Sequence, residues 1–247
     1  VRSLSIIPTY NATFEIPTEP IRVDPGGGGD AQFGVRSTGR LSGTWTLDVD
    51  STYLPSGWTW VDETPGGISS IEIGVGQVWT PSLRIIAPSD ALGSDAGFLD
   101  LTLSRDGGDE EISANLPVEA NRTRGLSIRG PDGTAQSTGY GLISEDARAW
   151  LLIENVGNAE ESQIAISWDG TEWGSDLRIF DSSGYEISAL TLGPGEEREV
   201  TARLPVPSGI TPGESVTTPL SMCVGAGDEQ ECSQVQLEFI SSRSVMD

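Results

Sequence analysis

The chain has no histidine and no lysine, and its 14 basic residues are all arginines. Histidine is the usual general base near neutral pH and lysine is the usual amine nucleophile, so two common routes to catalysis are missing. A hydrolase with two paired carboxylates is the remaining catalytic alternative. The acids are scattered over expected turns and outward strand positions, however, and no Asp-Thr-Gly or Asp-Ser-Gly phrase occurs. We therefore expect no catalytic residues and a non-enzymatic protein.

Positive charge is scarce, because 37 acidic residues face 14 basic ones and the formal net charge is -23. Such a surface repels nucleic acid and anionic lipid, so neither is an expected partner. The composition suits a protein that stays soluble at high ionic strength, where salt screens its self-repulsion. No apolar run approaches the roughly twenty residues of a membrane-spanning helix, so we expect no direct membrane insertion. The start at Val1 and the lack of a visible signal peptide are typical of a mature product or an excised fragment.

A repeated phrase organises the 247 residues of the chain. The stretch RIIAPSDALGSDAG at 84–97 reappears as RLPVPSGITPGESV at 203–216, after 119 positions. Further matches join RSLSI at 2–6 to RGLSI at 124–128, SGWTWV at 56–61 to SDLRIF at 175–180, and GVGQVW at 74–79 to GPGEER at 193–198. Self-similarity at a fixed period indicates a tandem repeat. We expect one module over residues 1–122 and a second over residues 123–247.

Short alternating segments predict that both modules are all-β. Trp45 and Leu47 alternate with polar neighbours in the first module, and the corresponding Ile164, Ile166 and Trp168 do so in the second. Period-two alternation is typical of strands with one buried and one wet face, so Trp45 and Trp168 are expected on the core face. With about seven or more such segments per module, two tandem immunoglobulin-like β-sandwich domains are the best interpretation. An eight-stranded jelly roll is the alternative.

Several turn phrases are similar to those of a known family. IENVGNAEES at 153–162, LGPGEEREVTARLPVP at 192–207 and TPGESV at 211–216 resemble the immunoglobulin-like modules called CARDB and NEW3, from secreted and surface proteins of bacteria and archaea. LPSGW at 54–58 resembles the P-x-G-W phrase of the NEW3 type, whereas VRSTGR and GVGQ replace the N-x-G-N and GPGE phrases in the first module. The resemblance implies adhesion, spacing or accessory roles on large exported proteins, with no shared catalytic residues.

The two cysteines of the chain lie in the expected last hairpin of the second module. Cys223 and Cys232 fall on the outward parity of their strands, and they face each other directly if Leu220 faces Val235. We predict a cross-strand disulfide between them, which indicates an oxidising compartment and, with the resemblance, an extracellular or cell-surface location. Two free thiols or a bond to another chain are the alternatives. Two thiols without histidine do not favour a closed zinc site.

Aromatic residues provide two candidate binding surfaces. Trp58 and Trp60 share one strand face and are candidates for stacking on sugar rings, although a core position is the more frequent explanation of tryptophan in a sandwich. Trp150 and Leu152 alternate with core residues and so point outward, where the first module has a glutamine and a glycine. An exposed apolar pair often marks an interface, so we predict that Trp150 and Leu152 contact a neighbouring module, loop or subunit.

Two further features concern modification and metal binding. Asn11 and Asn121 begin N-x-T sequons near the module ends and are candidates for N-glycosylation, although chance sequons are common. Aspartates in turns, such as Asp24, Asp106 and Asp132, raise the alternative of structural calcium at a module junction. Asp-Gly pairs also form tight turns by themselves, and no D-x-D-x-D-G loop is present. We therefore expect no cofactor and no set of metal ligands.

These observations favour a structural or adhesive segment of an exported cell-surface protein, which acts as a spacer or a protein-interaction platform. The expected partners are other modules of the same parent protein, neighbouring surface proteins and glycans. One alternative is an accessory carbohydrate-binding module of a secreted enzyme or adhesin. Another is a subunit of an extracellular filament or surface layer, in which residues 1–16 are donated to the sheet edge of a neighbour.

Overall fold

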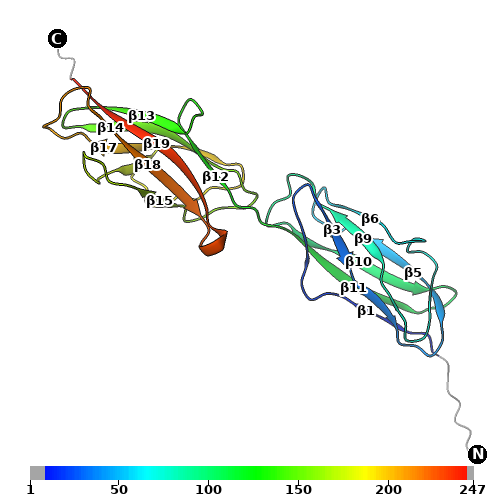
Figure 1. The fold of residues 1–247 in the computed structure, drawn as a ribbon. Helices are drawn as coiled ribbons and strands as arrows, with labels where there is room; N and C mark the ends of the chain where they lie inside the picture. Colours follow the sequence, from blue (N-terminus) through cyan, green and yellow to red (C-terminus); the bar gives the residue numbers. More distant parts are fainter. Residues whose placement is uncertain (1–8, 244–247) are drawn as a thin grey trace, which may run out of the picture. The chain divides into compact units, whose positions relative to one another are not determined.

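The computed structural model describes residues 9–243 and divides the chain into two compact units, Val1–Arg122 and Thr123–Asp247 (Figure 1). Each unit is an immunoglobulin-like β-sandwich, which confirms the predicted all-β fold. Within residues 9–243, helix is limited to a short 3-10 turn, η1 (Gly227–Glu229). No helix in this described part has the length and apolar character that a membrane crossing needs.

Unit 1 arranges its strands in two layers. One layer is the five-stranded sheet β2-β11-β10-β5-β7, and the other consists of the three-stranded sheets β1-β4-β8 and β3-β9-β6. The strands are β1 (Ala12–Glu15), β2 (Ile21–Val23), β3 (Gly28–Gln32), β4 (Gly34–Ser37), β5 (Gly43–Asp50), β6 (Thr59–Asp62), β7 (Ile71–Ile73), β8 (Val78–Trp79), β9 (Ser82–Ile86), β10 (Ala96–Arg105) and β11 (Glu111–Ala120).

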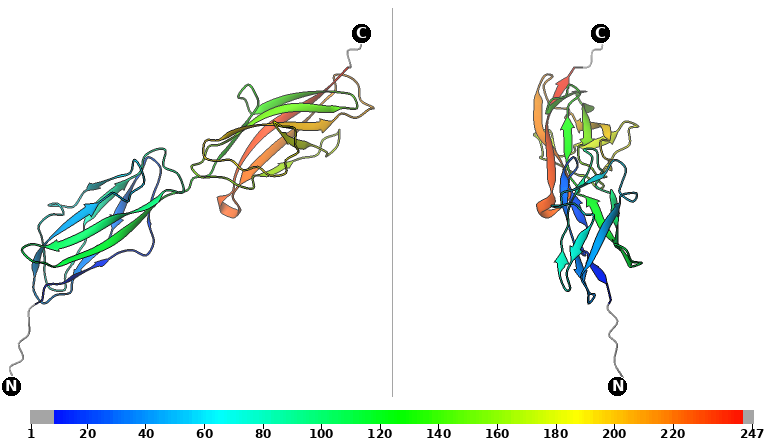
Figure 2. Two further views of the ribbon diagram at one scale, coloured as in Figure 1. Left: turned by 180° about the vertical axis from the view of Figure 1, so that it is seen from behind. Right: turned by 90° about the vertical axis from the view of Figure 1, so that its right-hand side faces the viewer.

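Unit 2 repeats this plan, and Figure 2 shows it from two further directions. One layer has the order β15-β18-β19-β13, the other has the order β12-β14-β17-β16, and a single pairing of Tyr140 with Arg148 joins β13 to β14. The strands are β12 (Leu126–Arg129), β13 (Gln136–Leu142), β14 (Asp146–Asn155), β15 (Ala165–Trp168), β16 (Arg178–Asp181), β17 (Glu197–Pro205), β18 (Ser215–Val224) and β19 (Glu231–Ser242).

A proline explains why one layer is split in unit 1. β9 pairs with β3 and β8 pairs with β4, so β8 and β9 follow the same line, but Thr80 and Pro81 between them make no ladder. Proline has no backbone N–H to donate and its fixed φ disturbs a strand interior. The corresponding residue of unit 2 is Val200, and there β17 runs without interruption and pairs with β14 along its whole length.

Each unit has its own hydrophobic core, as the alternating pattern predicts. Trp45 and Leu101 are fully buried in unit 1, and Leu151 and Phe239 are fully buried in unit 2. Trp168 lies on the predicted core face, because it is directly opposite the buried Leu220. Trp168 is nevertheless 37% exposed, since β15 is an edge strand, and its indole Nε1 donates to the backbone oxygen of Ser175 at 3.3 Å.

The pairing registers correct one part of the repeat. β1 pairs with β4 as β12 pairs with β14, so residues 12–15 occupy in unit 1 the position of residues 126–129 in unit 2. The RSLSI match at 2–6 lies outside the described residues. Residues 1–8 of the segment 1–16 proposed for donation also lie outside them, and the strand of its described half, β1, already pairs within its own unit.

Where the two layers approach closely, β2 with β3 in unit 1 and β13 with β14 in unit 2, each unit has a glycine. The glycine is on the second strand in unit 1 and on the first strand in unit 2. In unit 2 a Cβ added to Gly141 of β13 would lie 2.5 Å from the Cα of Ala147 on β14. In unit 1 the equivalent of Gly141 is Val23, and the small residue is Gly29, whose added Cβ would lie 3.0 Å from Val23 Cγ2. One residue of each pair must be small, because backbone atoms occupy the space that a second side chain would need.

Candidate functional site

The outward side chains of β14, β16 and β17 form the surface that we call the outer face of unit 2. Trp150 and Leu152 lie on it, and the prediction that they point away from the core is confirmed. Trp150 is 44% exposed and Leu152 is partly buried, whereas Leu151 between them has no exposed surface. The hydroxyl of Ser137 on β13 donates to the backbone oxygen of Trp150 at 2.6 Å, which holds this part of β14 in place.

A shallow surface hollow of about 110 Å³ lies beside Trp150 and Leu152, and Pro131 and Glu199 also line it. Pro131 belongs to the loop between β12 and β13. The carboxylate of Asp132 braces that loop by accepting hydrogen bonds from the backbone N–H and hydroxyl of Thr134, which lower the pKa of Asp132. The loop thus lies against part of the predicted interface. Contact of Trp150 and Leu152 with another module or subunit stays a prediction.

Three arginines lie next to one another across the same face. Arg148 of β14 is directly opposite Arg203 of β17, which is directly opposite Arg178 of β16. We call these residues the arginine row. Directly opposite residues on neighbouring antiparallel strands have Cβ atoms about 4.5–5.5 Å apart, and like charges in such pairs are destabilising. The row therefore concentrates positive charge at a cost in stability.

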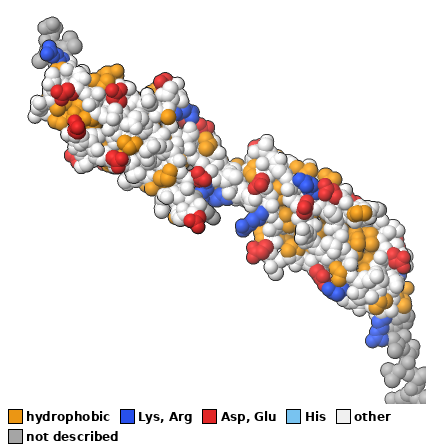
Figure 3. Space-filling model, viewed as in Figure 1, with side chains coloured by type: hydrophobic (Ala, Val, Ile, Leu, Met, Phe, Trp, Pro, Cys, Tyr) orange, Lys and Arg blue, Asp and Glu red, His pale blue; other side chains and the backbone are white. Residues whose placement is uncertain are grey.

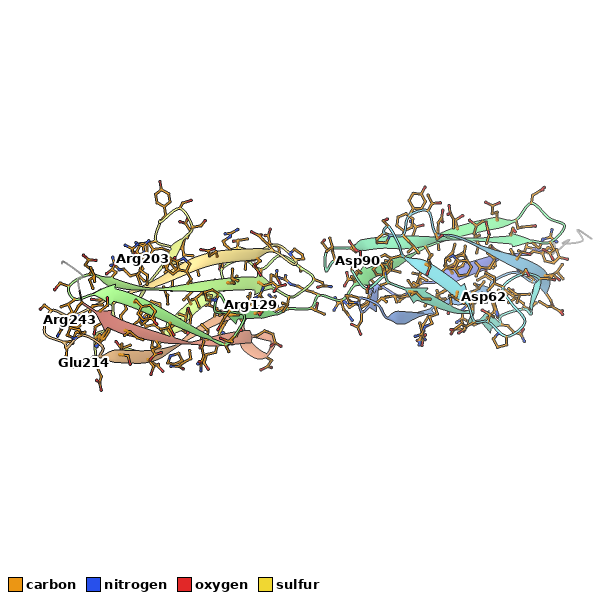
Figure 4. The ribbon with its side chains drawn as sticks, turned by 90° about the horizontal axis from the view of Figure 1, so that it is seen from above. Asp62, Asp90, Arg129, Arg203, Glu214 and Arg243 are labelled. Atoms are coloured by element: carbon orange, nitrogen blue, oxygen red, sulfur yellow. A yellow bond between two sulfur atoms is a disulfide. The ribbon has the colours of Figure 1, made fainter. Side chains whose placement is uncertain are left out.

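Phe180 contacts the central arginine of the row, Arg203, and one end member, Arg178. The guanidinium carbon of Arg203 lies 3.8 Å from the centre of the Phe180 ring and that of Arg178 lies 5.6 Å from it. Phe180 is on the outward side of β16, yet it is 8% exposed. Because a cation over an aromatic ring is attracted by the ring quadrupole, Phe180 fixes the position of Arg203, which is labelled in Figure 4.

Carboxylates compensate the arginine row only in part. Arg178 reaches Asp146 at an N–O distance of 3.4 Å, but Arg148 and Arg203 form no ion pair with any acid whose side chain the structure describes. Among the described residues, the buried Nε atoms of Arg178 and Arg203 have no hydrogen-bond acceptor. A guanidinium is always charged near neutral pH and offers five donors. The arginine row thus has positive charge that is not neutralised and N–H donors that have no acceptor.

Other arginines are paired with acids. Arg129 binds both Glu154 and Glu197, and its hydrogen bond to Glu154 raises the pKa of Arg129. Arg124 binds the buried Glu161 at 2.6 Å. On the face drawn in Figure 3, the blue arginine side chains are few and separate, and several lie beside red acids. On that face, arginine side chains therefore lie apart from one another.

The corresponding face of unit 1 is neutralised. Its β3 carries Asp30 where β14 carries Arg148, and Asp30 lies opposite Arg84, the counterpart of Arg203. The two side chains form an ion pair at 3.7 Å. The strand beyond Arg84 contributes Val61 opposite it rather than an arginine. Of the two units, unit 2 thus carries the row of arginines that is only partly neutralised.

The predicted tryptophan pair of unit 1 does not form a sugar-stacking strip, which corrects that candidate. Trp58 precedes β6 and is 6% exposed, because its indole is part of the unit 1 core. Trp60 is partly buried and packs against the same core. A ring that stacks on a sugar needs an open face, and Trp58 has none. Among the predicted aromatic sites, Trp150 keeps an open surface.

The predicted disulfide is confirmed. Cys223 of β18 and Cys232 of β19 are directly opposite each other, with Cα atoms 4.1 Å apart, and they are bonded on the outward side of the hairpin that Figure 1 shows. The predicted facing of Leu220 and Val235 is also found. Unit 1 has Ser104 opposite Glu111 at the corresponding place. A disulfide of this kind indicates an oxidising environment.

The sequons differ in the state of their asparagines. Asn11 is exposed immediately before β1, and its backbone oxygen accepts hydrogen bonds from the N–H groups of Thr38 and Gly39. The side-chain amide of Asn121 donates to Asp24 at 2.7 Å. Glycosylation of Asn121 would replace one hydrogen of the amide that makes this contact, whereas Asn11 is exposed. Modification of either residue stays a prediction.

The turn aspartates mainly hold their own turns. Asp24 accepts from Asn121, Asp106 accepts from the hydroxyl of Thr46 at 3.0 Å, and Asp132 accepts from Thr134. Within residues 9–243, no group of three or more Cys, Asp or Glu side chains is arranged to hold a metal ion. These carboxylates therefore have structural hydrogen bonds of their own, as short polar side chains in turns usually do.

No protein-family model and no curated protein matches the chain. A titin structure is 11% identical, with a TM-score of 0.41, and the match covers 95% of this chain and 100% of that one. A PapD-like domain of human CEP192 is 14% identical, covers 48% of this chain and 86% of that one, and has a TM-score of 0.33. A family 123 glycoside hydrolase from Clostridium perfringens is 11% identical with a TM-score of 0.36, and the match covers 51% of this chain but 28% of that chain.

Sequence reasoning missed the arginine row, although one signal was present. The repeated phrase begins with arginine in both copies, at Arg84 and Arg203, and the strand aligned before it carries Asp30 in one copy and Arg148 in the other. Comparing the residues opposite the repeated arginine would have revealed the reversal of charge. That comparison needs the pairing register of β14 with β17, which alternation alone does not determine.

Proposed function

We propose that the chain is a non-enzymatic interaction segment of an exported cell-surface protein, in which unit 1 acts as a spacer and unit 2 provides the contact surface. The observation that carries this proposal is the difference between the copies on one face of the same sandwich. Unit 2 places the exposed Trp150 and the partly buried Leu152 beside arginines without ion pairs, and unit 1 has Gln32, Gly34 and the Asp30–Arg84 pair there. A large apolar side chain exposed on an inner strand is typical of an interaction surface.

Three further features support the proposal. The chain has no histidine and no lysine, which leaves few groups for acid–base or nucleophilic catalysis. The Cys223–Cys232 disulfide fits a protein exposed to an oxidising environment. The strong negative charge keeps such a segment soluble and disfavours contact with nucleic acid and anionic lipid. The partners that fit are modules of the same parent protein, neighbouring surface proteins and glycans.

The proposal is tested by adhesion of beads that carry the full chain to intact cells that produce the parent protein. The double variant Trp150→Gln with Leu152→Gly gives unit 2 the residues of unit 1 at both positions. We expect it to reduce bead adhesion about tenfold or more, because central aromatic contacts dominate binding at such surfaces. The matched control is Val61→Gln, which removes an exposed apolar residue from unit 1. Equal adhesion of the double variant and the unchanged chain would refute the proposal.

A further inference from the structure

We propose that the arginine row of unit 2 binds an acidic saccharide, that is, a glycan bearing carboxylate or sulfate groups. In this arrangement Arg148, Arg203 and Arg178 bind the acidic groups, and Trp150 and Tyr140 contact the sugar rings. The inference rests on the proposed function, because it assigns a ligand class to the same outer face.

The first step concerns the unbalanced charge. Arg148 and Arg203 have no ion pair in the described part of the chain, and the row repels itself because its members are direct cross-strand neighbours. An anion between these guanidinium groups would remove that repulsion and would supply acceptors for their N–H groups. The chain has a net charge of -23, so acidic residues are common in it. An acidic residue in place of Arg148 would neutralise Arg203. Unit 1 does so with Asp30.

The second step concerns the chemistry of the donors. The planar guanidinium fork matches the two oxygens of a carboxylate or sulfate, and such bidentate pairs are among the strongest hydrogen bonds in proteins. The guanidinium of Arg203 lies 3.8 Å from the Phe180 ring centre, and Arg178 donates a hydrogen bond to Asp146. Positioned arginines lose little freedom when an anion binds, which favours binding. Two of the three arginines are therefore positioned before an acidic group binds.

The third step concerns the shape of the ligand. Neighbouring strands lie about 4.7–4.9 Å apart, so the three arginines extend over roughly 10 Å across the sheet. A row of this length fits a chain with several acidic groups better than one small anion. Tyr140 lies opposite Arg148 at one end of the row and is 63% exposed, and Trp150 is two residues along β14 from Arg148. Exposed aromatic faces beside polar groups suit the apolar faces of sugar rings.

The charge of the whole chain separates this ligand from a nucleic acid. A protein with 37 acids and 14 bases repels a polyanion of high charge density at long range, and a row of three arginines is too short to reverse that repulsion. A saccharide with spaced acidic groups carries less charge and makes close contacts within the row. Salt then screens the long-range repulsion while the short contacts persist.

Binding is measured by calorimetry with the full chain at about 0.1 M salt. The probes are an oligomer of uronic acid, its neutral methyl ester, a sulfated oligosaccharide and a polyglutamate peptide of similar charge. We expect the uronate or the sulfated probe to bind and the methyl ester not to bind. Binding of the uronate alone identifies carboxylate as the recognised group, and binding of the sulfated probe alone identifies sulfate. The saccharide assignment is wrong if only polyglutamate binds or if the methyl ester binds equally well.

Variants connect the binding to the arginine row. Arg148→Asp copies the arrangement of unit 1 and is expected to weaken binding about tenfold to a hundredfold, because it removes charge-assisted hydrogen bonds. Trp150→Gln is expected to weaken it about fivefold through lost ring contact. The control Arg40→Asp makes the same change of charge at an exposed arginine of unit 1. Equal losses in Arg148→Asp and Arg40→Asp would show that net charge, and not the row, controls binding.

The two proposals fail in different ways. If the Trp150→Gln, Leu152→Gly variant loses adhesion to cells but no acidic saccharide binds the chain, the outer face of unit 2 is a contact surface for another kind of partner. In that case the saccharide inference alone is overturned. If the saccharide binds and Arg148→Asp abolishes this, but cell adhesion is the same in every variant, the ligand class stands and the proposed surface role is wrong.

Discussion

Units 1 and 2 build the same sandwich from equivalent strands, but they treat the outward face of one layer in opposite ways. In unit 1 the repeated arginine, Arg84, forms an ion pair with Asp30 on the neighbouring strand. In unit 2 the corresponding Arg203 lies between two further arginines. The folds agree because the inward positions of both copies are apolar, and the faces differ because outward positions are free to vary. Function is therefore best sought where the outward residues of two equivalent strands diverge.

The same comparison separates structural differences from functional ones. Val23 with Gly29 in unit 1 and Gly141 with Ala147 in unit 2 are two solutions to one packing problem, and each keeps its strands close. The exchange of Asp30 for Arg148 solves no packing problem, since both side chains are exposed. A difference that keeps a glycine at the close approach indicates a packing requirement, and a difference that creates repulsion indicates another purpose.

The largest expected effect breaks the strand packing of unit 2. Gly141→Val puts the residue of unit 1 where an added Cβ would lie 2.5 Å from backbone atoms of Ala147. We expect the free energy of unfolding of unit 2 to fall by about 3 kcal/mol, at the upper end of the usual cost of overpacking. Hydrogen exchange measured by mass spectrometry on the full chain reports this for each unit separately, and unit 1 should keep its protection.

Compensation provides the control for Gly141→Val. Adding Ala147→Gly reproduces the arrangement of Val23 and Gly29, so the double variant should recover part of the lost stability although glycine itself weakens a strand. An unchanged or larger loss in the double variant would show that the two units do not pack these strands equivalently.

The next effect concerns the disulfide, which unit 1 lacks. Cys223→Ser with Cys232→Ser removes a link between residues nine positions apart, and the entropy of a loop of this size corresponds to about 2 to 3 kcal/mol. Denaturant unfolding of the chain should then show an earlier transition for unit 2 and an unchanged one for unit 1. A chain that unfolds at the same denaturant concentration with and without the bond would contradict a stabilising role.

The alternation of apolar residues and the comparison of the two copies predicted the β-sandwich fold and the direction of several side chains. The facing of Cys223 and Cys232 followed from parity within one hairpin, and the outward direction of Trp150 followed from its buried neighbours. Alternation gave the face of Trp168 but not its partial exposure, because alternation does not show whether the opposite layer extends over an edge strand. The arginine row required the register of strands far apart in the chain. Local sequence patterns do not fix such registers.

A smaller effect is expected in the turn that resembles the N-x-G-N phrase. Asn155 is fully buried, its amide donates to the backbone oxygens of Ala159 and Leu192, and its oxygen accepts from Gly157. Unit 1 has Ser37 at this position. Asn155→Ser leaves buried carbonyls without donors, so we expect unit 2 to lose about 1–2 kcal/mol of stability in thermal unfolding. The exposed control Asn115→Ser should change stability by less than about 0.5 kcal/mol.

The smallest change in stability is the most informative, because its sign is unusual. Arg148→Asp replaces a repelling neighbour of Arg203 by an attracting one, so unit 2 should become more stable by about 0.5 kcal/mol. The reverse change in unit 1, Asp30→Arg, should destabilise that unit by a similar amount, and about 1 M salt should reduce both effects. Urea midpoints of the two variants at low and high salt measure this. A residue whose replacement increases stability and removes saccharide binding is maintained for binding, whereas a loss of stability in Arg148→Asp would mean that the arginine row serves the fold.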